Sequence, residues 1–379
     1  MSPDRPVYLD CCATTPVDEE VLEAMTYYFR DEYGNAGSRT HQYGNAAAQA
    51  IRKAREQVAA VVGASWNEVV FTSGATESNN LALLGLASKA AKLGKRHIIS
   101  TQIEHKSVLE PLEHLETLGF EVTLLPPTSD GVVEAEFVRE ALRPDTFLVS
   151  VMHVNNETGV IQPIDEIAAV LSAHPAIFHT DATQGFGKDL DALRDNRVDL
   201  ISVSAHKIFG PKGVGALIVK ESSRPAAPQP LVYGGGQERG FRAGTLATPL
   251  IVGFGLASEI AVRDSRKRAG KCIAFRLEMM SALASLEPLM NGPPDKILPH
   301  IASLRFADID SEAIMLGLKD LVAISNGSAC TSANYAPSHV LAAMQMSPAE
   351  VEATTRWSWC HKTPRPSWPT VVSRIKSLC

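Results

Sequence analysis

The chain has 379 residues, a length typical of two or three domains that can bury a substantial core. Its composition, 45% hydrophobic and 21% charged, is that of a globular protein and excludes a disordered or fibrous chain. The formal net charge of −6 gives no overall attraction to phosphate backbones or anionic lipid, so we expect no direct binding of nucleic acid.

The first residues, MSPDRPVYLDCC, carry neither the basic nor the apolar region of a secretory signal. No later apolar run approaches the roughly 18 residues that cross a membrane, so we expect no membrane association and a cytoplasmic location. The six cysteines, which begin with Cys11 and Cys12, include no CxxC pair and are too few for a disulfide framework. We therefore expect no metal site.

From about residue 66 to 220, helix-length segments alternate with short apolar runs, which is typical of an α/β fold. Amphipathic helices are predicted over 45–62 and 162–173. Seven predicted strands are nearly continuously apolar, as expected when helices cover both faces of a mostly parallel sheet. These strands span residues 69–72, 97–100, 121–125, 147–152, 176–180, 200–204 and 215–219.

The last third of the sequence has a different pattern. Long helical stretches over 246–287 precede two weaker strand candidates, at 303–306 and 355–359, which predicts a smaller α+β domain. The helix at the boundary has no linker composition, so the boundary is approximate. The predicted domains are a large one over 16–260 and a small one made of 1–15 and 261–379.

Three segments carry residue types that suit one cofactor. The run FTSGATESNN, residues 71–80, predicts a strand, a glycine turn and a helix start whose N–H groups and hydroxyls can bind a phosphate. Asp181 ends a predicted strand, where a carboxylate can pair with a pyridinium N–H. Lys207, in SAHKIFGPKG, follows another strand and can form an imine with a carbonyl cofactor. Taken singly, these are an ordinary helix start, a cap and a solvated lysine, but their order favours a shared site.

In that order, the phosphate loop, the acid and the lysine resemble the fold-type I pyridoxal-phosphate enzymes. Further segments are similar to the motif series of the cysteine desulfurases, and matching motifs extend from residue 8 to residue 358. These segments are YLDCCATTP at 8–16, GNAGSRTHQYG at 34–44, EHKSVL at 104–109, VMHVNNETGVIQPI at 151–164, GGGQERGFRAGT at 234–245 and SNGSACTSAN at 325–334. The resemblance implies a large domain with a mostly parallel seven-stranded sheet and pyridoxal 5'-phosphate as the cofactor.

The family roles transfer to matching positions of this sequence. By this resemblance, Lys207 would bind the cofactor covalently and Asp181 would keep its pyridine nitrogen protonated. His105 would stack on the ring and move protons. Gln184 would hydrogen-bond the phenolate oxygen of the cofactor, and Asn156 would contact the substrate or the ring.

The resemblance also implies how the phosphate and the substrate are bound. The phosphate-binding residues of one subunit would be Ala75, Thr76, Ser204 and His206. Thr245 would contact the phosphate from the neighbouring subunit, which implies a homodimer. Arg356 would pair with the substrate carboxylate, and Asn35 and His41 would lie near the substrate entrance.

Cys330 decides the predicted reaction. A free cysteine is most often a small buried hydrophobic residue, but SNGSACTSAN resembles the mobile nucleophile loop of the long-loop desulfurases, which include the nitrogen-fixation and iron–sulfur enzymes. The implied activity converts L-cysteine to L-alanine, leaving the sulfur as a persulfide on Cys330 for transfer to a sulfur-acceptor protein. The destination stays open among iron–sulfur cluster assembly, tRNA thiolation and DNA phosphorothioation.

Alternatives within the same fold are a selenocysteine lyase and a transaminase, although a transaminase would not need Cys330. A non-enzymatic scaffold or regulator is disfavoured because Lys207 is present. The sequence departs from the family at Cys11 and Cys12, where Asn-Ala is usual. We interpret these two residues as small side chains in a packed turn and disfavour a second sulfur acceptor there.

Overall fold

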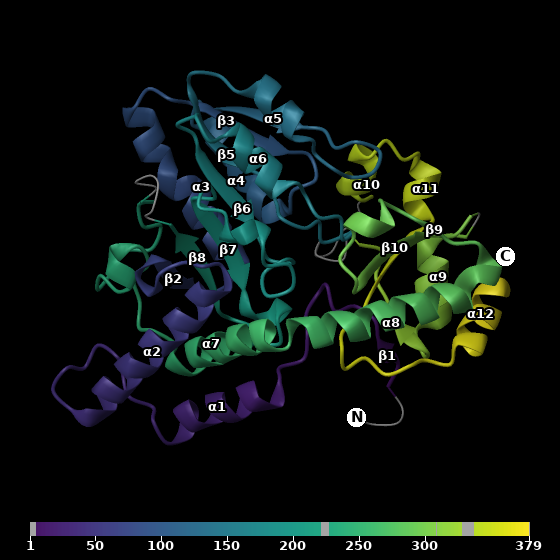
Figure 1. Ribbon diagram of the computed structural model, residues 1–379, viewed down its shortest axis with the longest axis horizontal. Coiled ribbons are helices and arrows are strands. Elements are labelled where there is room, and N and C mark those ends of the chain that lie inside the picture. Colours follow the sequence, from purple (N-terminus) through teal and green to yellow (C-terminus); the bar gives the residue numbers. More distant parts are fainter. Residues whose placement is uncertain (1–4, 221–226, 308, 328–336, 379) are drawn as a thin grey trace.

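A seven-stranded sheet forms the centre of the larger lobe in the computed structural model, which describes residues 5–220, 227–307, 309–327 and 337–378 (Figure 1). The strand order is β2-β8-β7-β6-β5-β3-β4, and β8 is antiparallel to both of its neighbours while the remaining pairs are parallel. The predicted α/β class and the mostly parallel sheet are therefore confirmed. The strands are β2 (Val69–Thr72), β3 (His97–Thr101), β4 (Glu121–Leu125), β5 (Thr146–Ser150), β6 (Ile177–Asp181), β7 (Leu200–Ser204) and β8 (Gly215–Val219).

The apolar strand sequences reflect burial on both faces of the sheet. Every residue of β3, β5, β6, β7 and β8 is buried, and alternate residues enter two different cores. On β5, for example, Val149 belongs to one core and Leu148 to the other. The edge strand β4 is only partly buried, which agrees with its position at the end of the strand order.

Three predicted strands of the large sheet, at 97–100, 147–152 and 176–180, differ from the observed strands β3, β5 and β6 by one or two residues at one or both ends. Strand β5 begins at Thr146, whose hydroxyl lies 2.7 Å from Nδ1 of His97, and it ends at Ser150, before the predicted end at 152. Strand β6 ends on Asp181, one residue later than predicted. This carboxylate therefore stands at the very edge of the sheet.

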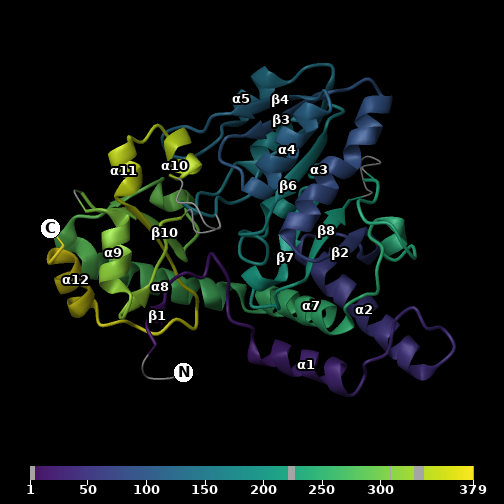
Figure 2. The ribbon, with the colours of Figure 1, turned by 180° about the vertical axis from the view of Figure 1, so that it is seen from behind.

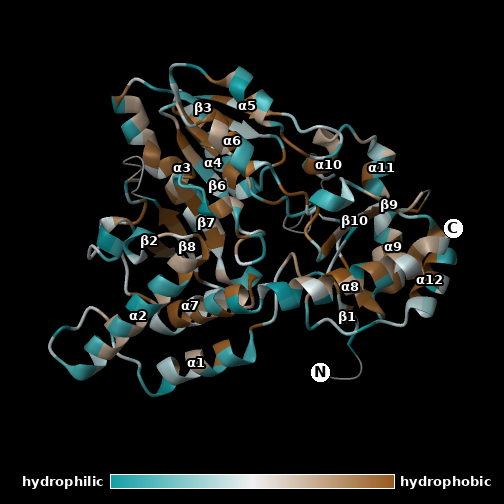
Figure 3. Ribbon diagram, viewed as in Figure 1, coloured by the Kyte–Doolittle hydropathy of each residue, from teal (hydrophilic) through white to brown (hydrophobic). Residues whose placement is uncertain are grey.

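Helices cover both faces of this sheet. One core contains residues of α2, α6 and α7, and the core on the opposite face contains residues of α3 and α4. Figure 3 shows the apolar strands enclosed between helices with hydrophilic outer faces. No helix in the described ranges is both long and apolar enough to cross a membrane. The helices are α1 (Glu19–Arg30), α2 (Gln42–Val61), α3 (Ala75–Lys92), α4 (Lys106–Thr117), α5 (Ala135–Ala141), α6 (Ile164–Val170) and α7 (Thr248–Arg263).

The smaller lobe has its own hydrophobic core. Its centre is aromatic, with Phe275 stacked on Trp359 at a centroid distance of 5.2 Å and Trp357 fully buried nearby. Leu9 from the N-terminal segment belongs to the same core. The helices are α8 (Ser265–Leu283), α9 (Ser311–Leu318), α10 (His339–Ala343), α11 (Pro348–Glu352) and α12 (Trp368–Lys376), and the strands are β1 (Val7–Tyr8), β9 (Leu289–Met290), β10 (Ile301–Arg305), β11 (Val322–Ala323) and β12 (Thr354–Ser358).

The N-terminal segment crosses between the lobes. Strand β1 pairs in parallel with β11 of the smaller lobe, and the chain then passes to α1 beneath the larger lobe (Figure 2). Helices α7 and α8 are separated only by Asp264. The predicted division at about residue 260 falls within α7, and the exact boundary stays a prediction.

A buried ion pair joins α2 to the glycine-rich segment 234–245. Arg55 and Glu238, which are 7% and 4% exposed, form a salt bridge. Arg55 also donates to the carbonyl of Val69 at 2.8 Å, and Glu238 accepts from the N–H of Phe71 at 2.7 Å. Since both charges are buried, each needs the other to offset its lost hydration.

We expect Glu238→Ala to lower the free energy of unfolding by about 3 to 5 kcal/mol, because it leaves the Arg55 guanidinium buried without a counter-charge. Urea unfolding followed by fluorescence measures this loss. The matched control is Glu56→Ala, which removes an exposed ion pair with Arg52 and should change stability little. Equal losses in the two variants would contradict the role of the buried pair.

Candidate active site

A cavity of about 450 Å³ opens at the carboxyl ends of β6 and β7, beside the loop that follows β2. Ligands of open α/β sheets bind at this edge, where the loops that follow the parallel strands lie. Ten of the predicted site residues line it: Ala75, Thr76, His105, Asn156, Asp181, Gln184, Ser204, His206, Lys207 and Arg356. Residues distant in the sequence are thus brought to one place.

Lys207 lies in a short turn after β7, and its side chain is 9% exposed. Its Nζ donates to the backbone carbonyls of Cys12 and Ala13, the latter at 2.9 Å. The N-terminal segment therefore forms the wall behind the lysine. Both of these acceptors are uncharged backbone groups.

Asp181 and His105 are connected through two intermediate side chains. Nδ2 of Asn79 donates to Asp181 at 2.7 Å and to the hydroxyl of Ser107 at 2.8 Å. That hydroxyl lies 2.8 Å from Nδ1 of His105, and the N–H of Thr183 donates to the second oxygen of Asp181 at 2.9 Å. This network fixes the carboxylate and the imidazole relative to each other inside the cavity.

The loop between β2 and α3 provides the predicted phosphate-binding end of the cavity. Gly74 precedes α3 with φ 156° and ψ −179°, which is open essentially only to glycine, so Ala75 and Thr76 begin the helix and direct its free N–H groups to the cavity. His206, whose Nδ1 lies 3.1 Å from the hydroxyl of Thr14, lines the same end together with Lys212. Burial, with further contributions from the charges of Lys207 and Lys212, lowers the pKa of His206 to about 4. The ring is therefore neutral at neutral pH.

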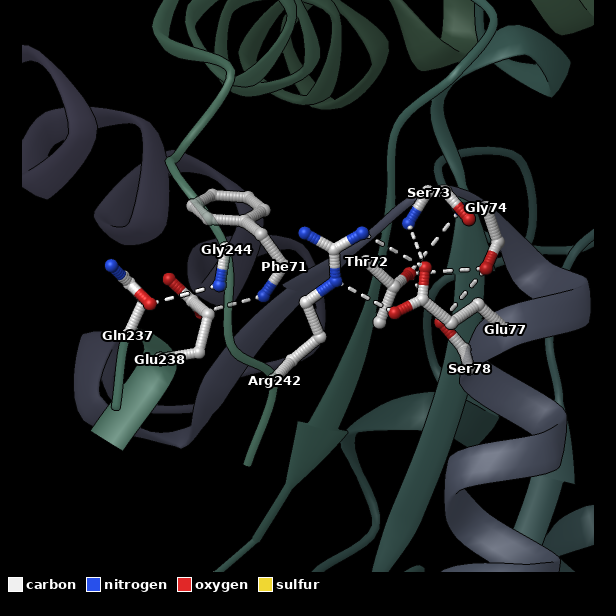
Figure 4. Close-up of polar contacts among 10 residues, drawn as sticks. All are labelled: Phe71, Thr72, Ser73, Gly74, Glu77, Ser78, Gln237, Glu238, Arg242 and Gly244. Carbon is white, nitrogen blue, oxygen red and sulfur yellow. Dashed lines mark hydrogen bonds and ion pairs between the residues drawn. The ribbon is translucent and has the colours of Figure 1, made fainter. Parts of the chain in front are cut away.

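The glycine-rich segment holds this loop in place (Figure 4). Nε of Arg242 donates to Glu77 at 2.8 Å, and Glu77 accepts from the N–H of Ser73 at 2.7 Å. Within the segment, Gln237 accepts from the N–H of Gly244 at 2.8 Å. Arg242 therefore offsets the charge that Glu77 places in the first turn of α3 next to the cavity.

Arg356 reaches the cavity from β12 of the smaller lobe and is 2% exposed. One terminal nitrogen donates to Asp10 at 2.7 Å, and the other donates to the backbone carbonyl of Asn156 at 2.9 Å. Its Nε has no hydrogen-bond partner among the described residues. The guanidinium is thus held in place through both of its terminal nitrogens.

Four predicted residues stand apart from the cavity of the single chain. His41 caps α2 by accepting from the N–H of Gly44 at 3.2 Å, and Asn35 accepts from the N–H of Gly37 at 2.9 Å. Neither residue lines the cavity, and Thr245 does not line it either. Cys330 lies outside the described residues. The predicted roles of these four residues stay predictions.

Sequence reasoning missed several residues that the fold brings to the site. Asn79 lies within the motif at 71–80, but its role depends on Asp181 and Ser107, which belong to other elements. Lys212 lies within the lysine motif and lines the cavity. Cys12 contributes its backbone carbonyl, which accepts from Lys207 and, at 3.0 Å, from Gln184. A main-chain contact of this kind leaves no signal in residue type.

The family model for aminotransferase class-V matches residues 7–365. The chain belongs to the class-V aminotransferase family. A relative described as cysteine desulfurase IscS, from Anaeromyxobacter sp. (strain Fw109-5), is 48% identical over 344 residues, which cover 90% of this chain and 84% of the relative. The resemblance to the cysteine desulfurases inferred from the motifs is confirmed.

Two solved structures show the same fold. A protein described as NifS-like has a TM-score of 0.89 and 38% identity, with 98% of each chain covered. A structure described as SspA in complex with cysteine has a TM-score of 0.83 and 40% identity, covering 94% of this chain and 100% of that chain. The predicted fold-type I architecture is therefore confirmed at the level of the whole chain.

The cavity provides the chemical groups that pyridoxal phosphate, the cofactor implied by this family, requires. An amine, a carboxylate and a helix N-terminus line one space, as a carbonyl, a pyridine nitrogen and a phosphate demand. Two polar atoms of lining residues, Oε1 of Gln184 and Oγ1 of Thr183, are buried without a hydrogen-bond partner among the described residues. Unpaired polar atoms at a cavity wall fit a site built for a polar ligand.

Glu104 is a second buried carboxyl group near Asp181. It is fully buried, and its Oε1 accepts from the N–H of Met152 at 2.7 Å and from the hydroxyl of Thr101 at 3.2 Å. Its Oε2 has no partner among the described residues. Burial, together with the charge of Asp181, raises the pKa of Glu104 from 4.5 to about 8. Glu104 therefore keeps its proton at neutral pH.

We expect Glu104→Gln to become increasingly stable relative to the wild type as the pH rises from about 5 to about 8. In this window the folded wild type retains a proton that its unfolded chain releases, so its stability falls by up to about 1.4 kcal/mol per pH unit, and the glutamine variant lacks this loss. Urea unfolding of both proteins across the window measures the difference. A stability difference independent of pH would contradict a protonated Glu104.

Proposed function

We propose that this chain is a pyridoxal-phosphate-dependent cysteine desulfurase, which converts L-cysteine to L-alanine and leaves the sulfur as a persulfide on Cys330. The observation that carries this proposal is the convergence of Lys207, Asp181 and Arg356 on one cavity in a member of this family. Support for the substrate comes from the structural relative that was solved in complex with cysteine.

The cavity residues divide into three groups around the cofactor. Lys207 would bind its aldehyde carbon, and Asp181 would accept from its pyridine N–H. The phosphate would lie at the N-terminus of α3, held by Ala75, Thr76, Ser204, His206 and the added charge of Lys212. When bound, pyridoxal phosphate supplies an electron sink that stabilises negative charge at the substrate α-carbon.

The substrate is oriented by groups that are already fixed. Arg356 is held by Asp10 and by the carbonyl of Asn156, so its guanidinium would bind a carboxylate without a large loss of side-chain entropy. We assign the α-carboxylate to this group. Lys207, when its amine is free, would also act as the base that moves the α-proton of the substrate.

His105 is the second proton-handling group. Its ring is held through Ser107 and Asn79 to Asp181, so the imidazole keeps a fixed position in the cavity wall. We propose that Gln184, whose Oε1 is unpartnered among the described residues, contributes to binding the cofactor ring oxygen. Asn35 and His41 are proposed near the substrate entrance on the resemblance alone.

The sulfur transfer follows from the chemistry of thiols. The Cys330 thiolate attacks the substrate sulfur, the carbon–sulfur bond breaks, and its electron pair stays with the carbon fragment. Protonation of that carbon gives L-alanine, so one L-cysteine and one thiol become one L-alanine and one persulfide. A sulfur-acceptor protein would then remove the outer sulfur by thiol exchange.

The alternative activities differ in whether they need Cys330. A selenocysteine lyase would share the whole cavity, whereas a transaminase would not depend on Cys330. The receiving pathway, whether iron–sulfur assembly, tRNA thiolation or DNA phosphorothioation, is set by partner surfaces outside the cavity. We retain the expectations that the protein acts in the cytoplasm and does not itself bind nucleic acid.

We expect Cys330→Ser to retain bound cofactor and its visible absorbance while losing sulfur transfer from L-cysteine, because the thiol accepts sulfur and does not bind the cofactor. The measurement is sulfide release in the presence of a thiol reductant, with the absorption spectrum recorded on the same sample.

Lys207→Ala provides the opposite result and serves as the control. It should lose the adduct that borohydride reduces onto the lysine, together with all turnover. Turnover of Cys330→Ser at the wild-type rate would show that another thiol accepts the sulfur and would overturn the assignment of Cys330.

We expect each active site to be built by two chains. Thr245 is the last residue of the glycine-rich segment 234–245, which fixes the phosphate loop, yet it does not line the cavity of its own chain. Lys207→Ala and Thr245→Ala chains, refolded or co-expressed together, form mixed dimers in which one site has both residues intact. The activity of the mixture should exceed the sum of the two separate variants. Additive activities would contradict a shared site.

A further inference from the structure

A second cavity, of about 60 Å³, lies on the other side of the N-terminal segment from the active site. Cys12 lines the larger cavity and Cys11 lines this smaller one, so the two adjacent cysteines lie on opposite sides of the N-terminal segment. Two further thiols, Cys272 and Cys360, line the smaller cavity, and no carboxylate side chain does. Because a buried water needs roughly 10 to 15 Å³, the space holds a small molecule of a few heavy atoms.

Cys360 and Cys11 lie against each other at this cavity. Their side chains form one buried cluster with Phe209, and Sγ of Cys360 accepts from the hydroxyl of Thr363 at 3.5 Å. The contact with Cys11 is the largest cause that lowers the pKa of the Cys360 thiol to about 6, and the same contact and burial raise that of Cys11. The two thiols thus form a contacting pair in which Cys360 is the more acidic member.

Unpartnered nitrogen atoms surround this pair. Nζ of Lys188 is shielded from solvent and has no hydrogen-bond partner among the described residues, and the same holds for Nε2 of His300, whose residue is 7% exposed. Lys220 shows the ordinary arrangement, since its Nζ donates to the carbonyls of Leu193 and Asp195 at 3.0 and 2.9 Å. Burial lowers the pKa of Lys188, and the neighbouring thiols, of which Cys12 and Cys11 contribute most, oppose this shift.

Cys272 shows that burial alone does not lower the pKa of a thiol in this cavity. It lines the same cavity and is 7% exposed, against 8% for Cys360, but burial raises its pKa to about 12. The cavity therefore contains two equally buried thiols whose pKa values are shifted in opposite directions. Within the described part of the chain, no group of three or more His, Cys, Asp or Glu side chains is placed to hold a metal ion.

We propose that Cys360 and Cys11 form a second sulfur-reactive site, which takes the outer sulfur of a small persulfide or polysulfide. In the first step the Cys360 thiolate attacks the terminal sulfur of R–S–SH, the sulfur–sulfur bond breaks, and R–S⁻ leaves, giving Cys360–S–SH. In the second step Cys11 attacks the inner sulfur, forming the Cys11–Cys360 disulfide and releasing hydrogen sulfide. The two thiols are oxidised and the transferred sulfur is reduced to sulfide, so no other oxidant is needed.

This site goes beyond the proposed desulfurase activity and does not require it. The site is linked to the active site through the backbone, because Cys11 is followed directly by Cys12, whose carbonyl accepts from Lys207. The N–H of Cys11 is bound to the carbonyl of Ser358 at 3.0 Å, so the backbone at the pair is held from both sides.

The test uses the Cys330→Ser holoenzyme, in which the proposed catalytic thiol cannot compete, and sodium disulfide as the sulfur donor. After brief exposure and alkylation, peptide mass spectrometry locates added sulfur and new disulfides. We expect sulfur on Cys360, or the Cys11–Cys360 disulfide, to appear more than about tenfold faster than any modification of Cys272. Because the donor is supplied directly, failure of the desulfurase proposal would leave this result unchanged.

Variants separate the two steps. Adding Cys11→Ser should accumulate the Cys360 persulfide and abolish the disulfide, and adding Cys360→Ser should remove both products. Thr363→Val, which keeps every thiol but removes one donor to Cys360, should slow the first step and guards against a loss of folding in the cysteine variants. Equal labelling of Cys272 and Cys360, or no sulfur on either, would overturn the proposal.

Discussion

The hydrogen bonds of residues 10–15 hold the two lobes and the cofactor lysine in one arrangement. On the side of the smaller lobe, Asp10 pairs with Arg356 and the N–H of Cys12 donates to the hydroxyl of Ser358 at 2.9 Å. On the other side, the carbonyl of Cys12 accepts from Lys207, and Thr15 donates its N–H to the carbonyl of His206 at 3.0 Å. Arg356 and Lys207, the proposed substrate-binding and cofactor-binding residues, are therefore positioned from different lobes by one short stretch of backbone.

Charge inside this structure is arranged in three different ways. Arg55 and Glu238 neutralise each other directly, Glu104 retains a proton, and Lys188 lies among thiols. Each solution keeps a buried group from standing as an isolated charge, which would cost several kcal/mol. The pKa values of Glu104 and Cys360, about 8 and about 6, lie near neutral pH, so the protonation of these two buried groups can change without unfolding.

Local sequence pattern predicted most of the larger lobe, because its strands are short apolar runs buried on both faces and its helices are amphipathic. The motif positions also placed Asp181 and Lys207 at strand ends, and the cavity brings them together. What the sequence did not predict depends on long-range contact. Asn79 acts through residues of two other elements, and Cys11 meets Cys360 only because the N-terminal segment lies against β12. The interpretation of Cys11 and Cys12 as packed side chains agrees with their burial. It did not indicate that Cys360 lies next to Cys11.

The pairing of β1 with β11 determines when this protein can become complete during its synthesis. Val7 aligns with Val322, so the first strand emerges from the ribosome long before its partner exists. The seven strands of the larger sheet, by contrast, all precede residue 220 and can assemble while translation continues. The wall behind Lys207 is anchored at Ser358, so it closes only after residue 358 has been synthesised. The candidate active site is therefore completed well after the larger sheet has formed.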